Sequence, residues 1–260
     1  HCTSSWYEFE RNLFSSSGIM GTMPRPLVSG NQCLLVQSDE TGTIRDLFWP
    51  YVGLYNHVNG SRVRMGFWVD GAFSWLEGEG WSRELGPQSA EMRNEHLGLV
   101  VSWQDAAHPT FPLFERRMIL ASLREEPRDL RLFVSPDTRI CESDMGDTVL
   151  YHPGLQSMVH FKRDIWLGFS LRDEAGPVID QYNTGYKAFR DFVGTYLDAE
   201  DGELGMKPIE QGSVDSVFRA RWPDFQGEQE VTFRIEAASS LEELGRAVGK
   251  WVEESPGIPS

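Results

Sequence analysis

The stretch from residue 49 to residue 57 gathers the kinds of side chain that a sugar-binding site uses. It contains three aromatic rings, one amide and one imidazole, contributed by Trp49, Tyr51, Tyr55, Asn56 and His57. Flat aromatic faces can pack on a sugar ring, and amide, phenol and imidazole groups can hydrogen-bond its hydroxyls. A structural interpretation fits the same residues. In it the rings belong to a sheet core, and Asn56 with His57 forms a hydrogen-bonded pair that fixes a loop.

Strands on either side of a loop would position these side chains. Residues 43–49 are apolar, β-branched and aromatic, which predicts a strand. Residues 64–70 and 72–76 predict a hairpin, because Asp70-Gly71 is a favoured two-residue turn. The segment between them, residues 50–62, is then a surface loop, and surface loops often carry function.

The same strand pattern runs along most of the chain. Leu130, Leu132 and Val134 alternate with polar residues and share one face, and Gly, Pro and Asp interrupt such runs at intervals of about ten residues. We therefore predict an all-β fold, a large antiparallel β-sandwich over residues 23–238. Residues 1–22 lack this pattern and would be either vector-derived or an upstream extension.

Two segments have helical spacing instead. Residues 186–197 predict one helix inserted into the sandwich. Residues 240–251 predict a C-terminal helix in which Ser240 and Glu243 form a capping box. Its apolar stripe needs a partner, so we expect residues 239–260 to be a helical linker between the sandwich and a following domain. In the isolated chain the helix can fold back on the sandwich, pair with a second copy to form a dimer, or fray. The stripe consists of Leu241, Leu244, Val248 and Trp251.

Composition excludes several classes of function. The formal net charge is -15, which disfavours nucleic acid and anionic membrane surfaces as partners, and no apolar run is long enough to span a membrane. Three cysteines without CxxC spacing favour a reducing compartment, hence the cytoplasm, and the histidines form no metal-ligand pair. No metal and no cofactor are expected. No nucleophile elbow, dinucleotide-binding loop or phosphate-binding loop is present, so no catalytic residue can be named.

Five segments in order resemble the N-terminal domain of glycoside hydrolase family 15 proteins, the bacterial and archaeal glucoamylase, glucodextranase and trehalase group. The resemblance implies a β-supersandwich joined by a helical linker to an (α/α)6 barrel, which carries the catalytic glutamates. It therefore implies no catalytic residue in this chain. Leu54 and Tyr55 replace the amide and acid that relatives tend to have in the aromatic loop. The matching segments are residues 23–32, 42–59, 65–76, 144–153 and 208–216.

Three functional hypotheses follow. In the first, the chain is a non-catalytic module of an enzyme that acts on an α-glucan or α-glucoside; it docks on the barrel and lends a loop to the rim of the active site. In the second, it is a free-standing carbohydrate-binding protein that uses the aromatic loop. In the third, it is a self-contained enzyme, which would need two carboxyl groups about 5–10 Å apart in a cleft.

Overall fold

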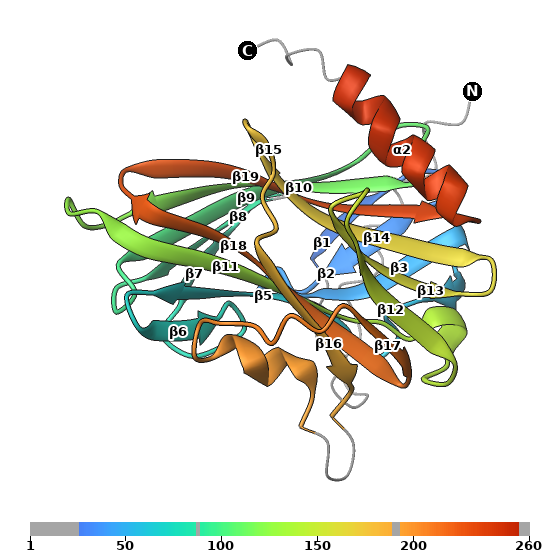
Figure 1. Cartoon of the computed structure of the whole chain (residues 1–260). Helices are drawn as coiled ribbons and strands as arrows, with labels where there is room; N and C mark the ends of the chain where they lie inside the picture. Colours follow the sequence, from blue (N-terminus) through green and yellow to red (C-terminus); the bar gives the residue numbers. More distant parts are fainter. Residues whose placement is uncertain (1–25, 87–88, 189–192, 255–260) are drawn as a thin grey trace, which may run out of the picture.

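The computed structural model describes residues 26–86, 89–188 and 193–254, and its strands form two antiparallel sheets packed face to face (Figure 1). This confirms the predicted all-β sandwich. The sheets, here called sheet A and sheet B, contain nine and ten strands within these residues. No helix in the described ranges combines the length and the hydrophobicity needed to cross a bilayer.

Sheet A has the strand order β1-β2-β3-β5-β11-β18-β16, with β4 paired to β3 and β6 paired to β5. The turn between β5 and β6 falls at Asp70-Gly71, as predicted, and both residues have positive φ (48° and 96°), as a two-residue hairpin turn requires. Its strands are β1 (Leu27–Gly30), β2 (Leu35–Ser38), β3 (Ile44–Tyr51), β4 (Leu54–Asn56), β5 (Arg62–Val69), β6 (Ala72–Trp75), β11 (Arg128–Asp137), β16 (Gln181–Tyr186) and β18 (Val214–Phe225).

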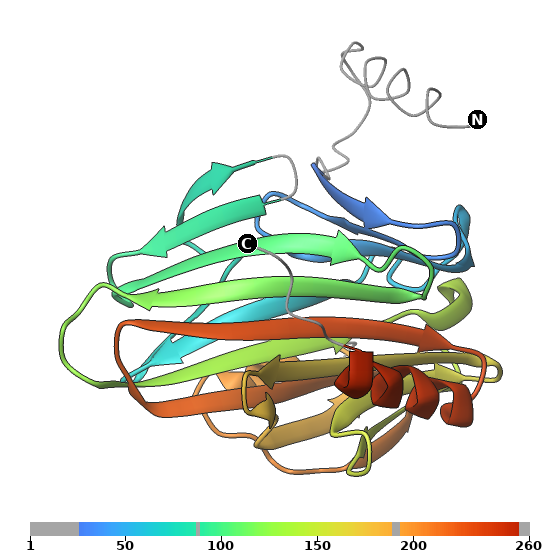
Figure 2. The same ribbon diagram turned by 90° about the horizontal axis from the view of Figure 1, so that it is seen from above.

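Sheet B has the order β17-β12-β13-β14-β19-β10-β9-β8-β7, with β15 paired to β14. Figure 2, seen from above, shows its long central strands crossing the full width of the sandwich. The strands are β7 (Ser82–Leu85), β8 (Ser89–Asn94), β9 (Leu99–Ala107), β10 (Leu113–Ser122), β12 (Asp147–His152), β13 (Ser157–Lys162), β14 (Ile165–Asp173), β15 (Gly176–Pro177), β17 (Ile209–Gly212) and β19 (Glu228–Ala238).

One large apolar core lies between the sheets. Successive side chains of a strand point to opposite faces, so the alternating residues Leu130, Leu132 and Val134 of β11 all face inward and are fully buried. Their neighbours Arg131 and Phe133 face the outer side of sheet A. The core also holds an ion pair: Arg116 and Asp105, 1% and 3% exposed at their side chains, meet at 2.7 Å.

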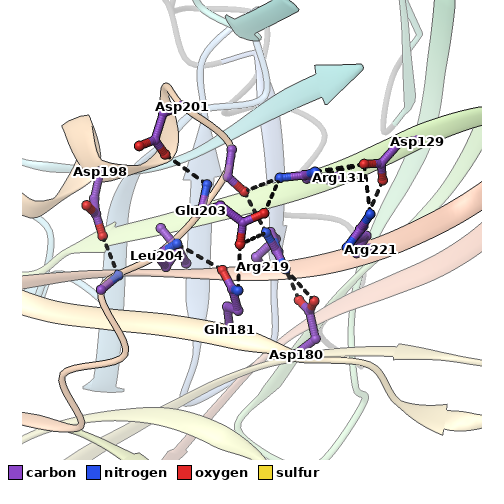
Figure 3. Close-up of polar contacts among 12 residues, drawn as sticks. Asp129, Arg131, Asp180, Gln181, Asp198, Asp201, Glu203, Leu204, Arg219 and Arg221 are labelled. Atoms are coloured by element: carbon purple, nitrogen blue, oxygen red, sulfur yellow. Dashed lines mark hydrogen bonds and ion pairs between the residues drawn. The ribbon is translucent and has the colours of Figure 1, made fainter. Parts of the chain in front are cut away.

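A strap, residues 194–207, crosses the outer face of sheet A and covers a second, smaller core. Ala199 and Leu204 of the strap pack there against Phe133 and Val217. Arginines of the sheet clamp the strap from below: Arg131 and Arg219 both donate to the carbonyl of Gly202 (2.8 and 2.6 Å) and both pair with Glu203 (2.6 and 3.1 Å; Figure 3). A Cβ at residue 202 would lie 2.7 Å from Arg131, so glycine allows this approach.

The helix predicted over residues 186–197 differs from what is found. Tyr186 ends β16 and pairs with Val214, and the described residues after it contain only a 3-10 turn, η3 (Thr195–Ala199), at the start of the strap. Residues 189–192 lie outside the described ranges. Sheet pairing and the clamp on the strap override the helical spacing of the apolar residues.

The predicted C-terminal helix is confirmed as α2 (Leu241–Glu254), which lies on the outer face of sheet B (Figure 2). Half of the predicted capping box forms: the Glu243 N–H donates to the Ser240 hydroxyl (3.1 Å), whereas the Glu243 carboxylate accepts from the N–H of Ser239 (3.0 Å) and not from that of Ser240. The helix follows two residues after β19, so it lies against β19 and β14. Residues 1–22, for which a vector or upstream origin is predicted, lie outside the described ranges.

Candidate functional site

The predicted aromatic loop is largely a hairpin with an exposed end. β3 extends to Tyr51, and β4 returns from Leu54, which pairs with Tyr51. Gly53, in the turn, and Tyr55, in β4, both have positive φ (86° and 65°). Four large side chains of this tip, residues 51–55, face solvent: Tyr51 is 65%, Val52 41%, Leu54 50% and Tyr55 45% exposed. Large apolar side chains gathered in this way make the tip a candidate interaction surface.

Asn56 fixes the base of the tip. It is 7% exposed, and its Oδ1 accepts from the N–H groups of Leu47 (3.1 Å), Val58 (3.1 Å) and Asn59 (3.0 Å). Its Nδ2 donates to Asp46 Oδ1 at 2.6 Å. Both ends of the amide are therefore occupied by the protein itself.

His57 connects β3 to the short 3-10 turn η2 (Ile140–Glu142). It is fully buried; the Cys141 N–H donates to Nδ1 (3.1 Å), so Nε2 carries the proton and donates to the Trp49 carbonyl (2.7 Å). Burial lowers the pKa of His57, in keeping with this neutral form. Trp49 is itself 7% exposed and belongs to the core. The structure thus brings the five predicted residues together but presents only Tyr51 and Tyr55 to solvent.

A polar pocket that the sequence did not reveal opens beside the strap, on the outer face of sheet A. Its volume is about 680 Å³. We call it the strap pocket. The polar and aromatic side chains that line it come from β5, β11, β18 and the segments next to them. They are Arg62, Arg64, Ser135, Asp137, Arg139, Asp144, Lys187, Tyr196, Ser213 and Asp215.

Every cation of the strap pocket is paired. Lys187 meets Asp137 at 3.0 Å and Asp144 at 2.8 Å, and Arg139 meets Asp144 at 3.1 Å. Burial raises the pKa of Asp144, but the hydrogen bond and charge of Lys187, with Arg139, more than offset it and hold that pKa below its usual range.

On the other side of the pocket, Arg62 and Arg64 share Glu77 at 3.0 and 3.3 Å. The Arg64 guanidinium stacks on two rings, 4.1 Å from the centroid of Tyr196 and 5.1 Å from that of Trp75. The two rings and the ion pair with Glu77 hold the Arg64 guanidinium in one position. Burial lowers the pKa of Arg64.

Asp137, at the end of β11, and Asp215, near the start of β18, are two carboxyl groups that line this pocket. Burial first, and the charge of Asp137 as well, raise the pKa of Asp215 to about 7. Both oxygens of Asp215 accept from the Thr195 N–H (3.2 and 3.0 Å), and the residue is 2% exposed. Asp215 therefore anchors the strap.

The interface predicted at the C-terminal helix is partly used within the chain. Leu244 is fully buried with Val159 and Ala238 on sheet B, whereas Leu241 is 37% exposed and Val248 is half-buried. The Trp251 side chain lies outside the described part. Within the described residues, no group of three or more His, Cys, Asp or Glu side chains is arranged to hold a metal ion.

Comparisons with known proteins identify the fold. Neither the family models nor the curated proteins match this sequence. Among solved structures, a bacterial glucoamylase complexed with acarbose matches 93% of this chain with a TM-score of 0.70 and 12% sequence identity. This chain spans only 36% of that enzyme's length. The β-sandwich is therefore glucoamylase-like in structure.

Two other solved structures are similar at lower scores. One is a family GH92 inverting mannosidase from Bacteroides thetaiotaomicron, at TM-score 0.48 and 10% identity over 90% of this chain and 31% of that one. The other is an aldose epimerase homologue from C. elegans, at TM-score 0.47 and 8% identity over 82% of this chain and 98% of that one.

Proposed function

We propose that this chain is the non-catalytic β-sandwich module of a glycoside hydrolase that acts on α-glucosidic bonds. The fold match to the bacterial glucoamylase, 93% of this chain against 36% of that one, carries the proposal. Five sequence segments that resemble the N-terminal domain of glycoside hydrolase family 15 support it. The remainder of the parent protein would be an (α/α)6 catalytic barrel, on which the sandwich docks.

The docking role is supported by the position of the exposed tip, which lies at the same end of the sandwich as the start of α2. The tip is tied to η2, because the Asn56 N–H donates to Glu142 Oε1 (3.2 Å). The turn between β13 and β14 adjoins η2, since Lys162 Nζ donates to the Ile140 carbonyl (3.2 Å), and α2 lies on β14. Figures 1 and 2 both show η2 and the start of α2 toward the same end. A following domain would continue from the far end of α2, so the proposal requires it to extend back along the helix in order to use Tyr51 and Tyr55 at its active-site rim.

A reducing compartment, the cytoplasm, is part of the proposal. Cys33 and Cys141 are free thiols, and burial raises the pKa of both. A raised pKa keeps a thiol protonated and slow to oxidise.

The second candidate is a free-standing carbohydrate-binding protein, which the exposure of Tyr51 and Tyr55 favours. One experiment separates the two. Purified chain is incubated with maltose, isomaltose, trehalose and dextrin, and both released glucose and binding are measured. If the chain is the non-catalytic module, no glucose is released, and the double variant Tyr51→Ala/Tyr55→Ala binds the sugars no more weakly than the wild type does. Tip-dependent binding to dextrin supports the second candidate, and turnover that persists through repurification refutes both.

A further inference from the structure

We propose that the strap pocket is a binding site for a neutral, polyhydroxylated small molecule of mono- or disaccharide size. The proposal concerns the outer face of sheet A and does not depend on the module described above. The volume of the strap pocket, about 680 Å³, falls within the range of small-molecule sites.

The charge balance of the pocket argues for a neutral ligand. Lys187 and Arg139 pair with Asp137 and Asp144, and Arg62 and Arg64 share Glu77, all through direct contacts of 2.8 to 3.3 Å. With Asp215 in the lining, four carboxyl groups face these four cations. A charged ligand would have to displace one of these partners and leave it unpaired, which is costly at half-buried positions. A neutral ligand needs no such exchange.

The groups that remain unused are those that recognise hydroxyls. Among the described residues, none hydrogen-bonds the hydroxyls of Ser135 or Ser213, although both residues line the pocket. Ser135 lies directly opposite Arg64 in the β5–β11 register and is 1% exposed. Arg64 is 9% exposed, and its Nε is buried without a partner. A serine hydroxyl can donate and accept at once, which matches the alternating donors and acceptors of a sugar.

The walls of the pocket are fixed before any ligand arrives. The strap carries Tyr196. The contacts of Gly202 and Glu203 with sheet A (Figure 3), together with the bond from Thr195 to Asp215, hold the strap in place. The Tyr196 ring in turn packs edge-on against Trp75, with centroids 6.2 Å apart. A preformed polar site loses little conformational entropy on binding.

Binding is tested by calorimetry and by NMR shift perturbation with four neutral probes, glucose, maltose, trehalose and myo-inositol, against the anion glucose 6-phosphate. We expect saturable binding of at least one neutral probe, with weaker or no binding of the phosphate. Ser135→Ala and Ser213→Ala should each weaken it by roughly 3- to 10-fold, the worth of one hydrogen bond. The matched control Ser102→Ala, on the outer face of sheet B, should leave affinity unchanged.

Three outcomes overturn the proposal: no binding of any neutral probe, tighter binding of glucose 6-phosphate, or shift changes confined to the tip and abolished by Tyr51→Ala/Tyr55→Ala. Ser135→Ala deletes a hydroxyl that has no partner within the described residues, so this variant is expected to fold normally, and its thermal midpoint checks this. Shift changes at Ser135 and Ser213 with wild-type protein support the proposal even if one variant folds poorly.

Discussion

Replacing Leu244 by alanine should release α2 from the sandwich while leaving the sheets folded. An isolated helix of this length is marginal in water, so α2 depends on its contacts with sheet B. Among its described side chains Leu244 alone is fully buried, which stabilises docking by about 1.5–3 kcal/mol, and the Ser240 cap adds about 1 kcal/mol. Removing Leu244 costs roughly 2 kcal/mol or more. We therefore expect α2 amides to lose about 30-fold or more in hydrogen-exchange protection.

The experiment is native-state hydrogen exchange followed residue by residue, with two companion variants. Gly168→Ala should act in the same direction, because its new Cβ would lie 3.2 Å from Leu244 and push the helix outward. Leu241→Ala, on the same helix but 37% exposed, is the control and should change protection little. The reasoning is wrong if Leu241→Ala matches Leu244→Ala, or if amides of β14 and β19 lose protection together with those of α2.

Three further predictions concern buried polar groups. Burial raises the pKa of Glu236 to about 7, so its contribution to stability is complete below about pH 4.5 and is lost as pH rises through 7. Glu236→Gln should therefore gain up to about 3 kcal/mol over wild type between pH 4.5 and 8 in urea unfolding, and parallel pH profiles would contradict this. Asp105→Ala should cost about 3–5 kcal/mol, since it leaves the buried Arg116 charge unpaired; a loss below 1 kcal/mol would refute that. His57→Ala should cost about 2 kcal/mol or more by orphaning the Cys141 N–H and the Trp49 carbonyl, with Tyr51→Ala neutral as the exposed control.

Local patterns in the sequence were sufficient to predict the all-β sandwich class. The alternation in β11, the Asp70-Gly71 turn and the Ser240 cap each depend on neighbours within a few residues, and all three appear in the structure. The predicted helix over residues 186–197 failed because contacts far away in sequence decide that segment. Tyr186 pairs with Val214 in β18, and Thr195 bonds Asp215 on the same strand.

For the candidate sites too, features that depend on residues close together in the sequence could be predicted, and features that depend on distant contacts could not. The nearness of Trp49, Tyr51, Tyr55, Asn56 and His57 could be predicted because they lie within nine residues. Which of them face solvent could not, because η2, 84 residues further on, buries His57. The strap pocket left no sequence signal, since it forms only when strand register sets residues of β5, β11 and β18 side by side.

The central claim is that this sandwich serves a catalytic domain of α-glucosidic specificity and is not itself the catalyst. The most direct measurement is glucose release from maltose by the product of the complete reading frame that contains this chain, next to residues 23–260 alone. The account predicts glucose from the complete product and none from the shorter one. A complete product that leaves maltose, isomaltose, trehalose and dextrin intact, or a sandwich that hydrolyses one of them by itself, would contradict it.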